Sequence, residues 1–124
     1  MDTILIIDDS RFTRSNIAKA LRNNQYEVLE ADNGATGLDM IIKHKPDFVI
    51  TDLLMPEMDG FELLENLRSR GIAVPVIVMS ADIQETTRRR ILELGAKTLL
   101  NKPFQGTTLL DTLHSLAASE SAKT

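Results

Sequence analysis

Acidic side chains follow two apolar segments of this sequence at the point where each segment ends. Asp8 and Asp9 come directly after TILII at 3–7, and Asp52 comes directly after FVIT at 48–51. If these ends meet, three carboxylates share one site, and two unit charges about 4 Å apart repel by roughly 4 kcal/mol at an effective dielectric constant near 20. A hard divalent cation offsets such repulsion. Mg²⁺ suits an oxygen-only ligand set, whereas zinc and copper prefer sites with cysteine or histidine.

Two further apolar segments also end in polar side chains. VIVM at 76–79 is followed by Ser80, and KTLL at 97–100 is followed, after Asn101, by Lys102. The ammonium group of Lys102 would offset part of the carboxylate repulsion. Taken singly, such residues have structural explanations, because an aspartate often caps a helix and a lysine often lies in solvent. Their recurrence after four different segments favours one shared ligand site.

The apolar segments have the length and composition of β-strands. Those at 3–7, 48–51 and 76–79 are rich in Ile and Val and do not alternate with polar residues, which is typical of strands buried on both faces of a parallel sheet. The segment YEVLE at 26–30 alternates in polarity, and the segment at 97–100 is short. We therefore expect these last two segments to be the edge strands.

Apolar residues between the strands recur at the three-and-four spacing of amphipathic helices, which predicts five helices. Glycines fall at or near the expected helix ends, where glycine serves turns and caps. The predicted core-facing stripes are Thr13, Ile17, Ala20, Leu21 and Asn24; Ala35, Leu38, Ile41 and Ile42; Phe61, Leu63, Leu64 and Leu67; Ile83, Thr87, Ile91 and Leu94; and Leu109, Leu113, Leu116 and Ala117. The glycines are Gly34, Gly60, Gly71, Gly95 and Gly106.

Alternating strands and helices predict the α/β class, with right-handed crossovers and helices on both faces of a parallel sheet. Three buried strands and two edge strands fit a five-stranded, doubly wound sheet of the flavodoxin-like type, with the order 2-1-3-4-5 and five flanking helices. We expect residues 1–124 to form one domain. In this order the first and third strands are neighbours, so the three aspartates converge.

Composition limits the classes of function. The net charge of −4 argues against nucleic acid or an anionic membrane as a direct partner. The absence of cysteine excludes disulfides and thiolate metal sites and is compatible with the cytosol, so we predict a cytoplasmic location. No apolar segment approaches the roughly 20 residues that span a membrane.

Four segments together resemble the receiver domain of bacterial two-component response regulators, of the CheY-like type. They are LIIDDS, DLLMPEMDGFELL, VIVMSA and NKPF, and the resemblance covers residues 3–118. An acid pair alone is common. The acid pair, the Asp-x-x-Met-Pro-x-Met-Asp-Gly loop, the Ser-Ala and the Lys-Pro in this order are far more specific.

The resemblance implies a phosphorylation-activated signalling switch in which Asp52 is the phosphoacceptor. Asp52 would take a phosphoryl group from a phosphohistidine on a sensor histidine kinase or phosphotransfer protein and hold it as an acyl phosphate. Lys102 would pair with the phosphoryl oxygens, and Ser80 would donate a hydrogen bond to them. The chain would then be no enzyme in the usual sense, but a phosphoacceptor that assists its own phosphotransfer and self-dephosphorylation.

The resemblance also implies Mg²⁺ as the cofactor. Asp9, Asp52 and the backbone carbonyl of Leu54 would bind the ion, and Asp8 would act through a metal-bound water. It further implies a cis peptide before Pro103.

Signal output by protein–protein contact is the other implication of the resemblance. The fourth helix, fifth strand and fifth helix would form the surface that docks a target, in chemotaxis or a phosphorelay. Ser80 and Leu99 would form the internal switch. Leu99 departs from the family pattern, because receivers often carry Tyr or Phe at that position.

Several alternatives stay open at this point. A phosphohydrolase of the haloacid dehalogenase type needs a second Asp two residues after its nucleophile, where this chain has Leu54. A nucleotide- or flavin-binding domain needs a Gly-rich or Ser/Thr-rich phosphate loop where this chain has Asp8 and Asp9. A receiver-like module that acts without phosphorylation is a third alternative. The chain could also be an excised receiver of a longer regulator, such as one that binds DNA.

Overall fold

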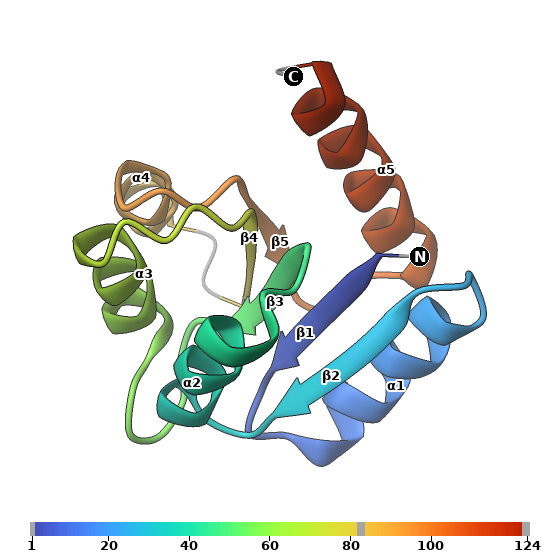
Figure 1. The fold of residues 1–124 in the computed structure, drawn as a ribbon, viewed down its shortest axis with the longest axis horizontal. Helices are drawn as coiled ribbons and strands as arrows, with labels where there is room; N and C mark the ends of the chain where they lie inside the picture. Colours follow the sequence, from blue (N-terminus) through green and yellow to red (C-terminus); the bar gives the residue numbers. More distant parts are fainter. Residues whose placement is uncertain (1, 82–83, 123–124) are drawn as a thin grey trace.

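The computed structural model describes residues 2–81 and 84–122 (Figure 1). Within these residues five strands and five helices alternate along the chain. The strands are β1 (Thr3–Ile7), β2 (Glu27–Ala31), β3 (Phe48–Asp52), β4 (Val76–Ser80) and β5 (Thr98–Asn101). The helices are α1 (Arg11–Arg22), α2 (Gly34–His44), α3 (Gly60–Ser69), α4 (Glu85–Glu93) and α5 (Gly106–Ala122).

The five strands form one parallel sheet in the order β2-β1-β3-β4-β5, which confirms the predicted fold class. The strands β2 and β5 lie at the edges, as their polarity and length predict. Each strand lies within one residue of its predicted range. Because every strand runs in the same direction, all five carboxyl ends reach the same edge of the sheet, where ligands bind in this class of fold.

Helices cover both faces of the sheet. Figure 1 shows α1 and α5 on one face and α2, α3 and α4 on the other. Alternate residues of β1 enter two separate cores: Leu5 and Ile7 pack with the α2–α4 side, and Ile4 and Ile6 pack with the α1–α5 side. From Ile4 to Ile7 the strand therefore buries side chains on both faces, which explains why its sequence shows no polar alternation.

Two residues predicted to face the core are exposed instead. Ile42 on α2 is 44% exposed, whereas its neighbour Ile41 is buried. One residue turns the helix by about 100°, so the two side chains cannot both face the sheet. Asn24 lies beyond the end of α1 and is exposed. Ile83, predicted to be on the fourth stripe, lies outside the described residues.

The helices that follow β1, β2 and β3 begin with capped N-termini. The side chains of Ser10, Asn33 and Asp59 each accept a hydrogen bond from a backbone N–H in the first turn. Such caps satisfy amide groups that lack a partner within the helix. The caps therefore fix where these three loops at the carboxyl edge of the sheet end.

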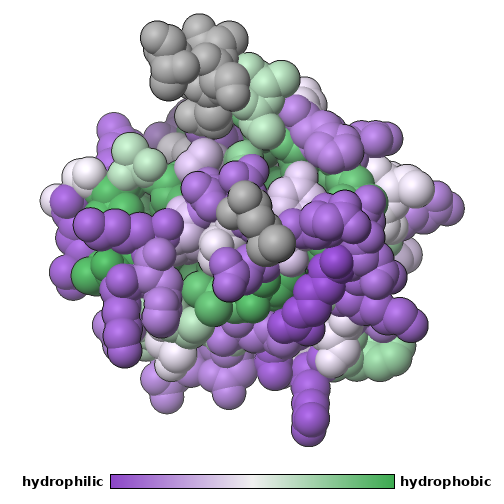
Figure 2. Space-filling view, turned by 45° about the vertical axis from the view of Figure 1, so that its right-hand side comes forward, coloured by the Kyte–Doolittle hydropathy of each residue, from purple (hydrophilic) through white to green (hydrophobic). Residues whose placement is uncertain are grey.

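The outer surface is mainly polar on the side of the molecule where α5 lies. Figure 2 shows hydrophilic residues over most of that face, with hydrophobic residues confined to small areas. Among the residues that the structure describes, no helix is long and apolar enough to cross a membrane.

Packing against the sheet predicts different costs for two isoleucines. Ile77→Ala in β4 should lower the free energy of unfolding by about 2–5 kcal/mol, because a fully buried side chain leaves a cavity. Ile42→Ala, on the exposed side of α2, should cost less than about 1 kcal/mol. Urea denaturation of both variants measures the difference. Equal losses would show that Ile42 packs in the core after all.

Candidate functional site

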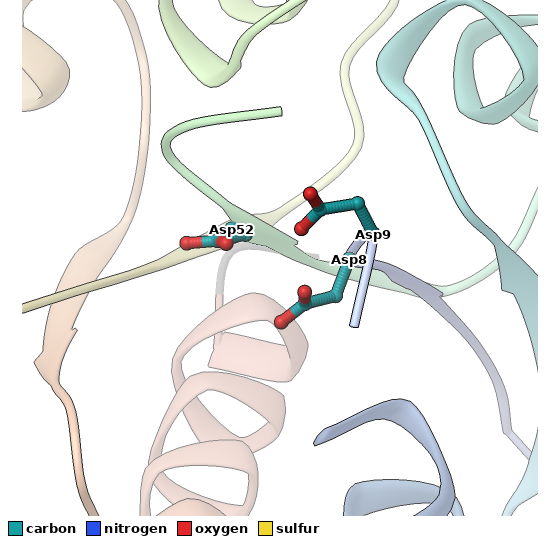
Figure 3. A group of neighbouring side chains, drawn as sticks. All are labelled: Asp8, Asp9 and Asp52. Carbon is teal, nitrogen blue, oxygen red and sulfur yellow. The ribbon is translucent and has the colours of Figure 1, made fainter. Parts of the chain in front are cut away.

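Three carboxylates converge at the carboxyl edge of the sheet. Asp8 and Asp9 follow β1, and Asp52 ends the neighbouring strand β3; one ligand oxygen of each lies within 4.8 Å of the others. Figure 3 shows the three side chains extending from these two strand ends toward a shared space. Asp8 is buried, Asp52 is partly buried and Asp9 is exposed. The site thus runs from the protein interior to solvent.

Asp8 is held in place by several hydrogen bonds. Its backbone N–H donates to the carbonyl of Ala31 at 3.1 Å, and its Oδ1 accepts from the backbone N–H of Ser10 at 2.8 Å. Arg14 Nη1 donates to the carbonyl oxygen of Asp8 at 2.7 Å. The cap of α1 is Ser10, so neither Asp8 nor Asp9 serves as the helix cap.

Arg14 is a residue of this site that the sequence reasoning missed. Besides the carbonyl of Asp8, its guanidinium contacts Glu30 of β2, with Nε 3.2 Å from Oε1. The side chain is only 16% exposed. The sequence does place Arg14 one turn into the helix that follows the acid pair, which could have suggested a place in the site. Many surface arginines share such a position, however.

Lys102 bridges two of the carboxylates. Its Nζ lies 3.1 Å from Asp8 Oδ2 and 3.3 Å from Asp52 Oδ2. Its backbone N–H donates to the carbonyl of Ser80 at 2.9 Å, and the peptide bond to Pro103 is cis. Lys102 is therefore a member of the acidic cluster rather than a solvated surface group.

The charges in this cluster shift the pKa of two groups. Burial raises the pKa of Asp52; the positive charge of Lys102 lowers it, and the negative charge of Asp8 raises it further. Burial lowers the pKa of Lys102, but its hydrogen bond to Asp8 and the charges of Asp52 and Asp8 raise it by more. Lys102 is in contact with both Asp8 and Asp52, so its one positive charge is shared between two carboxylates. The positive charge that the protein itself supplies at this site does not balance the negative charge of its carboxylates.

The loop after Asp52 is compact. The backbone N–H of Leu53 donates to Asp52 Oδ1 at 2.9 Å, and the N–H of Gly60 donates back to the carbonyl of Leu53 at 2.7 Å. The side chain of Leu54 is 70% exposed. Asp59 caps α3 and so ends the loop.

The predicted switch residues lie on neighbouring strands. Ser80 ends β4, is 4% exposed and pairs in register with Asn101 of β5. Leu99 of β5 is 7% exposed and packs in the core beneath α2, α3 and α4, together with Ile91 of α4.

The donor set suits a hard cation. Three carboxylates offer oxygen ligands within one site, and Lys102 compensates only part of their charge. Mg²⁺ is commonly bound by one or two carboxylates together with water. Asp8, Asp9 and Asp52 could therefore hold this ion.

Two solved structures with a similar fold are a receiver domain and a chemotaxis response regulator. One is the receiver domain of a Francisella response regulator, with a TM-score of 0.92, 28% sequence identity, and coverage of 97% of this chain and 99% of that one. Another is the chemotaxis response regulator CheY4 of Vibrio cholerae, with a TM-score of 0.86, 32% identity, and coverage of 93% and 98%.

Sequence relatives agree with the structural neighbours. The chain is 37% identical over 113 residues to response regulator MprA of Mycobacterium bovis and of Mycobacterium avium, which is 91% of this chain and 49% or 50% of the relative. It thus spans about half the length of these curated relatives. Residues 4–114 match the family described as the response regulator receiver domain. From this match and the shared fold, the chain belongs to the response regulator receiver domain family.

Proposed function

We propose that this receiver domain is a phosphorylation-activated switch in which Asp52 accepts the phosphoryl group. The convergence of Asp8, Asp9 and Asp52 carries this proposal, with Lys102 bound to two of the three. Asp52 is the last residue of the central strand β3, and it is the member of this cluster that the family resemblance matches to the phosphoacceptor. Family membership favours this function over a haloacid-dehalogenase-type phosphohydrolase or a nucleotide-binding domain.

The proposed transfer needs little chemistry beyond positioning and charge neutralisation. One carboxylate oxygen of Asp52 attacks the phosphorus of a phosphohistidine, the phosphorus–nitrogen bond breaks, and the imidazole leaves. The hydrogen bond from the N–H of Leu53 holds the other oxygen of Asp52. Lys102, already 3.3 Å from Asp52 Oδ2, would pair with the incoming phosphoryl oxygens.

Bound Mg²⁺ would supply positive charge that the protein itself lacks at this site. Asp9, Asp52 and the backbone carbonyl of Leu54 would hold the ion, with Asp8 acting through water. The raised pKa of Asp52 supports this assignment, because burial disfavours its charged form and the positive charge of Lys102 does not fully offset that effect. The domain would be a phosphoacceptor that assists its own phosphorylation and self-dephosphorylation, not a turnover enzyme.

The signal would then pass from Ser80 to the surface formed by α4, β5 and α5. The Ser80 hydroxyl would donate to the phosphoryl group, which draws the carboxyl end of β4 toward the site. Leu99 lies in the same buried cluster as Ile91 of α4, so it could follow that movement. An aliphatic side chain gains less packing energy than an aromatic ring, so we assign Leu99 the secondary role.

The partners are a sensor histidine kinase or phosphotransfer protein on the input side and a target protein on the output side. We propose that residues 1–124 act as a single receiver domain. Because the chain spans about half of its curated relatives, it could act alone or as the receiver of a longer regulator. A cytoplasmic location stays a prediction, as does the absence of direct contact with nucleic acid or membrane.

Asp52→Asn should abolish Mg²⁺-dependent phosphorylation by acetyl phosphate, because an amide oxygen is a poor nucleophile. Intact-mass spectrometry would detect one added phosphoryl group in the parent and none in the variant. Asp39→Asn, an exposed position on α2, is the matched control and should label normally. Undiminished labelling of Asp52→Asn would overturn the assignment. An unlabelled parent would favour a module that acts without phosphorylation.

Mg²⁺ should stabilise the folded protein by binding to its acidic cluster. At ten times its dissociation constant the ion contributes about 1.4 kcal/mol, or about 3–6 °C in melting temperature. Asp9→Ala should lose most of this increment, yet it should melt no lower than the parent without Mg²⁺, because one repulsive charge is gone. Asp39→Ala should respond to Mg²⁺ like the parent. If millimolar Mg²⁺ does not change the melting temperature of the parent, the proposed metal site is contradicted.

Ser80→Ala should remove most of the chemical-shift changes that phosphorylation causes in α4 and β5, because the hydroxyl starts the proposed movement. Leu99→Ala should keep most of them, although its buried cavity should lower stability. Two-dimensional amide spectra before and after treatment with acetyl phosphate and Mg²⁺ make the comparison. If Leu99→Ala abolishes the changes while Ser80→Ala retains them, the relay runs through Leu99 instead.

A further inference from the structure

The first residue of α2 approaches another part of the backbone too closely for any side chain. A Cβ on Gly34 would overlap the carbonyl oxygen of Met58 and would lie 2.8 Å from its carbonyl carbon and 2.9 Å from its Cβ. The backbone of Gly34 is not in the left-handed region, so its conformation does not require glycine. The reason for glycine here is the contact with Met58.

Met58 belongs to the loop that leaves the acid site, residues 53–59, which we name the β3–α3 loop. The hydrogen bond between Gly60 and Leu53 joins the two ends of this loop. A Cβ on Gly60 would also lie only 3.0 Å from Leu53 Cα and 3.2 Å from the carbonyl oxygen of Asp52. The far end of the loop therefore packs directly against the residues at the phosphoacceptor.

The tip of the β3–α3 loop is strained. Glu57 has a φ of 69°, and the N–H of Met58 donates to the carbonyl of Pro56 at 2.8 Å across it. This is a γ-turn around a non-glycine residue with positive φ, which is rare and costs of order 1–3 kcal/mol. Such a turn persists only where surrounding structure holds it.

Two helices supply that support at Met58. The Met58 side chain packs against the core on the α2–α4 side, and Asn66 Nδ2 of α3 lies 3.9 Å from its sulfur. On the backbone side, Gly34 of α2 lies against the Met58 carbonyl group. Met58 is thus held between α3 and the first turn of α2.

We propose that Gly34 is a positioning residue for the acid site. Its missing Cβ lets α2 hold Met58, and thereby the strained loop, in the conformation that the residues after Asp52 need for binding a cation and a phosphoryl group. This inference rests on the proposed function, because the β3–α3 loop matters only if Asp52 and its neighbours bind these groups. The contact involves backbone atoms, so a change of side-chain rotamer cannot relieve an added methyl group.

Gly37, one turn later in the same helix, provides the matched control. A Cβ there would overlap Ile7 Cδ1 and lie 2.9 Å from Ile7 Cγ1, both of them side-chain atoms of the buried core, so the added methyl group would press on the core and not on the β3–α3 loop. Both glycines are buried in α2, and alanine suits the helix at each position. The two substitutions therefore differ mainly in whether the β3–α3 loop must move.

Mg²⁺ titration of both variants, followed by the backbone amide shifts of residues 52–59, measures affinity in the folded state. Gly34→Ala should bind Mg²⁺ about tenfold more weakly than the parent, as expected when a residue that orients metal ligands is disturbed. Gly37→Ala should stay within about twofold, even where its melting temperature falls equally. The initial rate of labelling by acetyl phosphate should follow the same order. Parent-like Mg²⁺ affinity in Gly34→Ala would overturn the inference.

A second variant decides the matter if Gly34→Ala does not fold. Met58→Gly leaves α2 unchanged but removes the side chain and adds freedom at the held residue, so it too should weaken Mg²⁺ binding about tenfold. Unchanged affinity in Met58→Gly would show that the loop needs no such support. A parent that neither binds Mg²⁺ nor accepts a phosphoryl group would overturn the proposed function itself, whereas a parent that does both isolates the role of Gly34.

Discussion

Mutual repulsion among three carboxylates is the constraint around which this molecule is built. Asp8, Asp9 and Asp52 would each lower the electrostatic free energy by moving apart, and a pair about 4 Å apart repels by roughly 4 kcal/mol in a medium of intermediate dielectric. They stay together because each is joined to a central strand of the sheet. Packing of the two cores against those strands supplies the free energy that holds the charges in place.

The positive charge of Lys102 offsets only part of this repulsion. Lys102 reaches the buried Asp8 and the partly buried Asp52 from the loop after β5, so the two innermost carboxylates share one ammonium group. A buried charge without a partner is costly, which explains why the lysine contacts the most deeply buried acid. The remaining negative charge suits a cation, which would in turn favour the phosphoryl group of the proposed function.

The loops around the site are held at both ends. A cap at Ser10 ends the β1–α1 loop and one at Asp59 ends the β3–α3 loop, while Arg14 ties the acid pair to β2 through Glu30. A left-handed residue at Glu57 is tolerated within this frame, although it is unfavourable by itself. Rigid support around a strained turn is consistent with a site whose ligands must be placed before the reaction begins.

The sequence alone determined the strands, their order and the edge at which the acids lie. Strands that are buried on both faces have unbroken apolar sequences, as in β1. Parallel strands place their carboxyl ends at the same edge of the sheet. Helix faces were predicted less well, since a stripe at three-and-four spacing does not say which of Ile41 and Ile42 points inward. That choice depends on how the whole helix rotates against the sheet.

Only the tertiary structure decided which acid is buried, which pair Lys102 bridges, and why α2 begins with glycine. Lys102 and Asp8 are 94 residues apart in the sequence, and Gly34 of α2 contacts Met58 of the β3–α3 loop. No local pattern encodes such contacts, because they depend on distances that arise when segments far apart in the sequence pack together. Gly34 looks in the sequence like any glycine at a helix end, and its reason for being glycine is the carbonyl group of another loop.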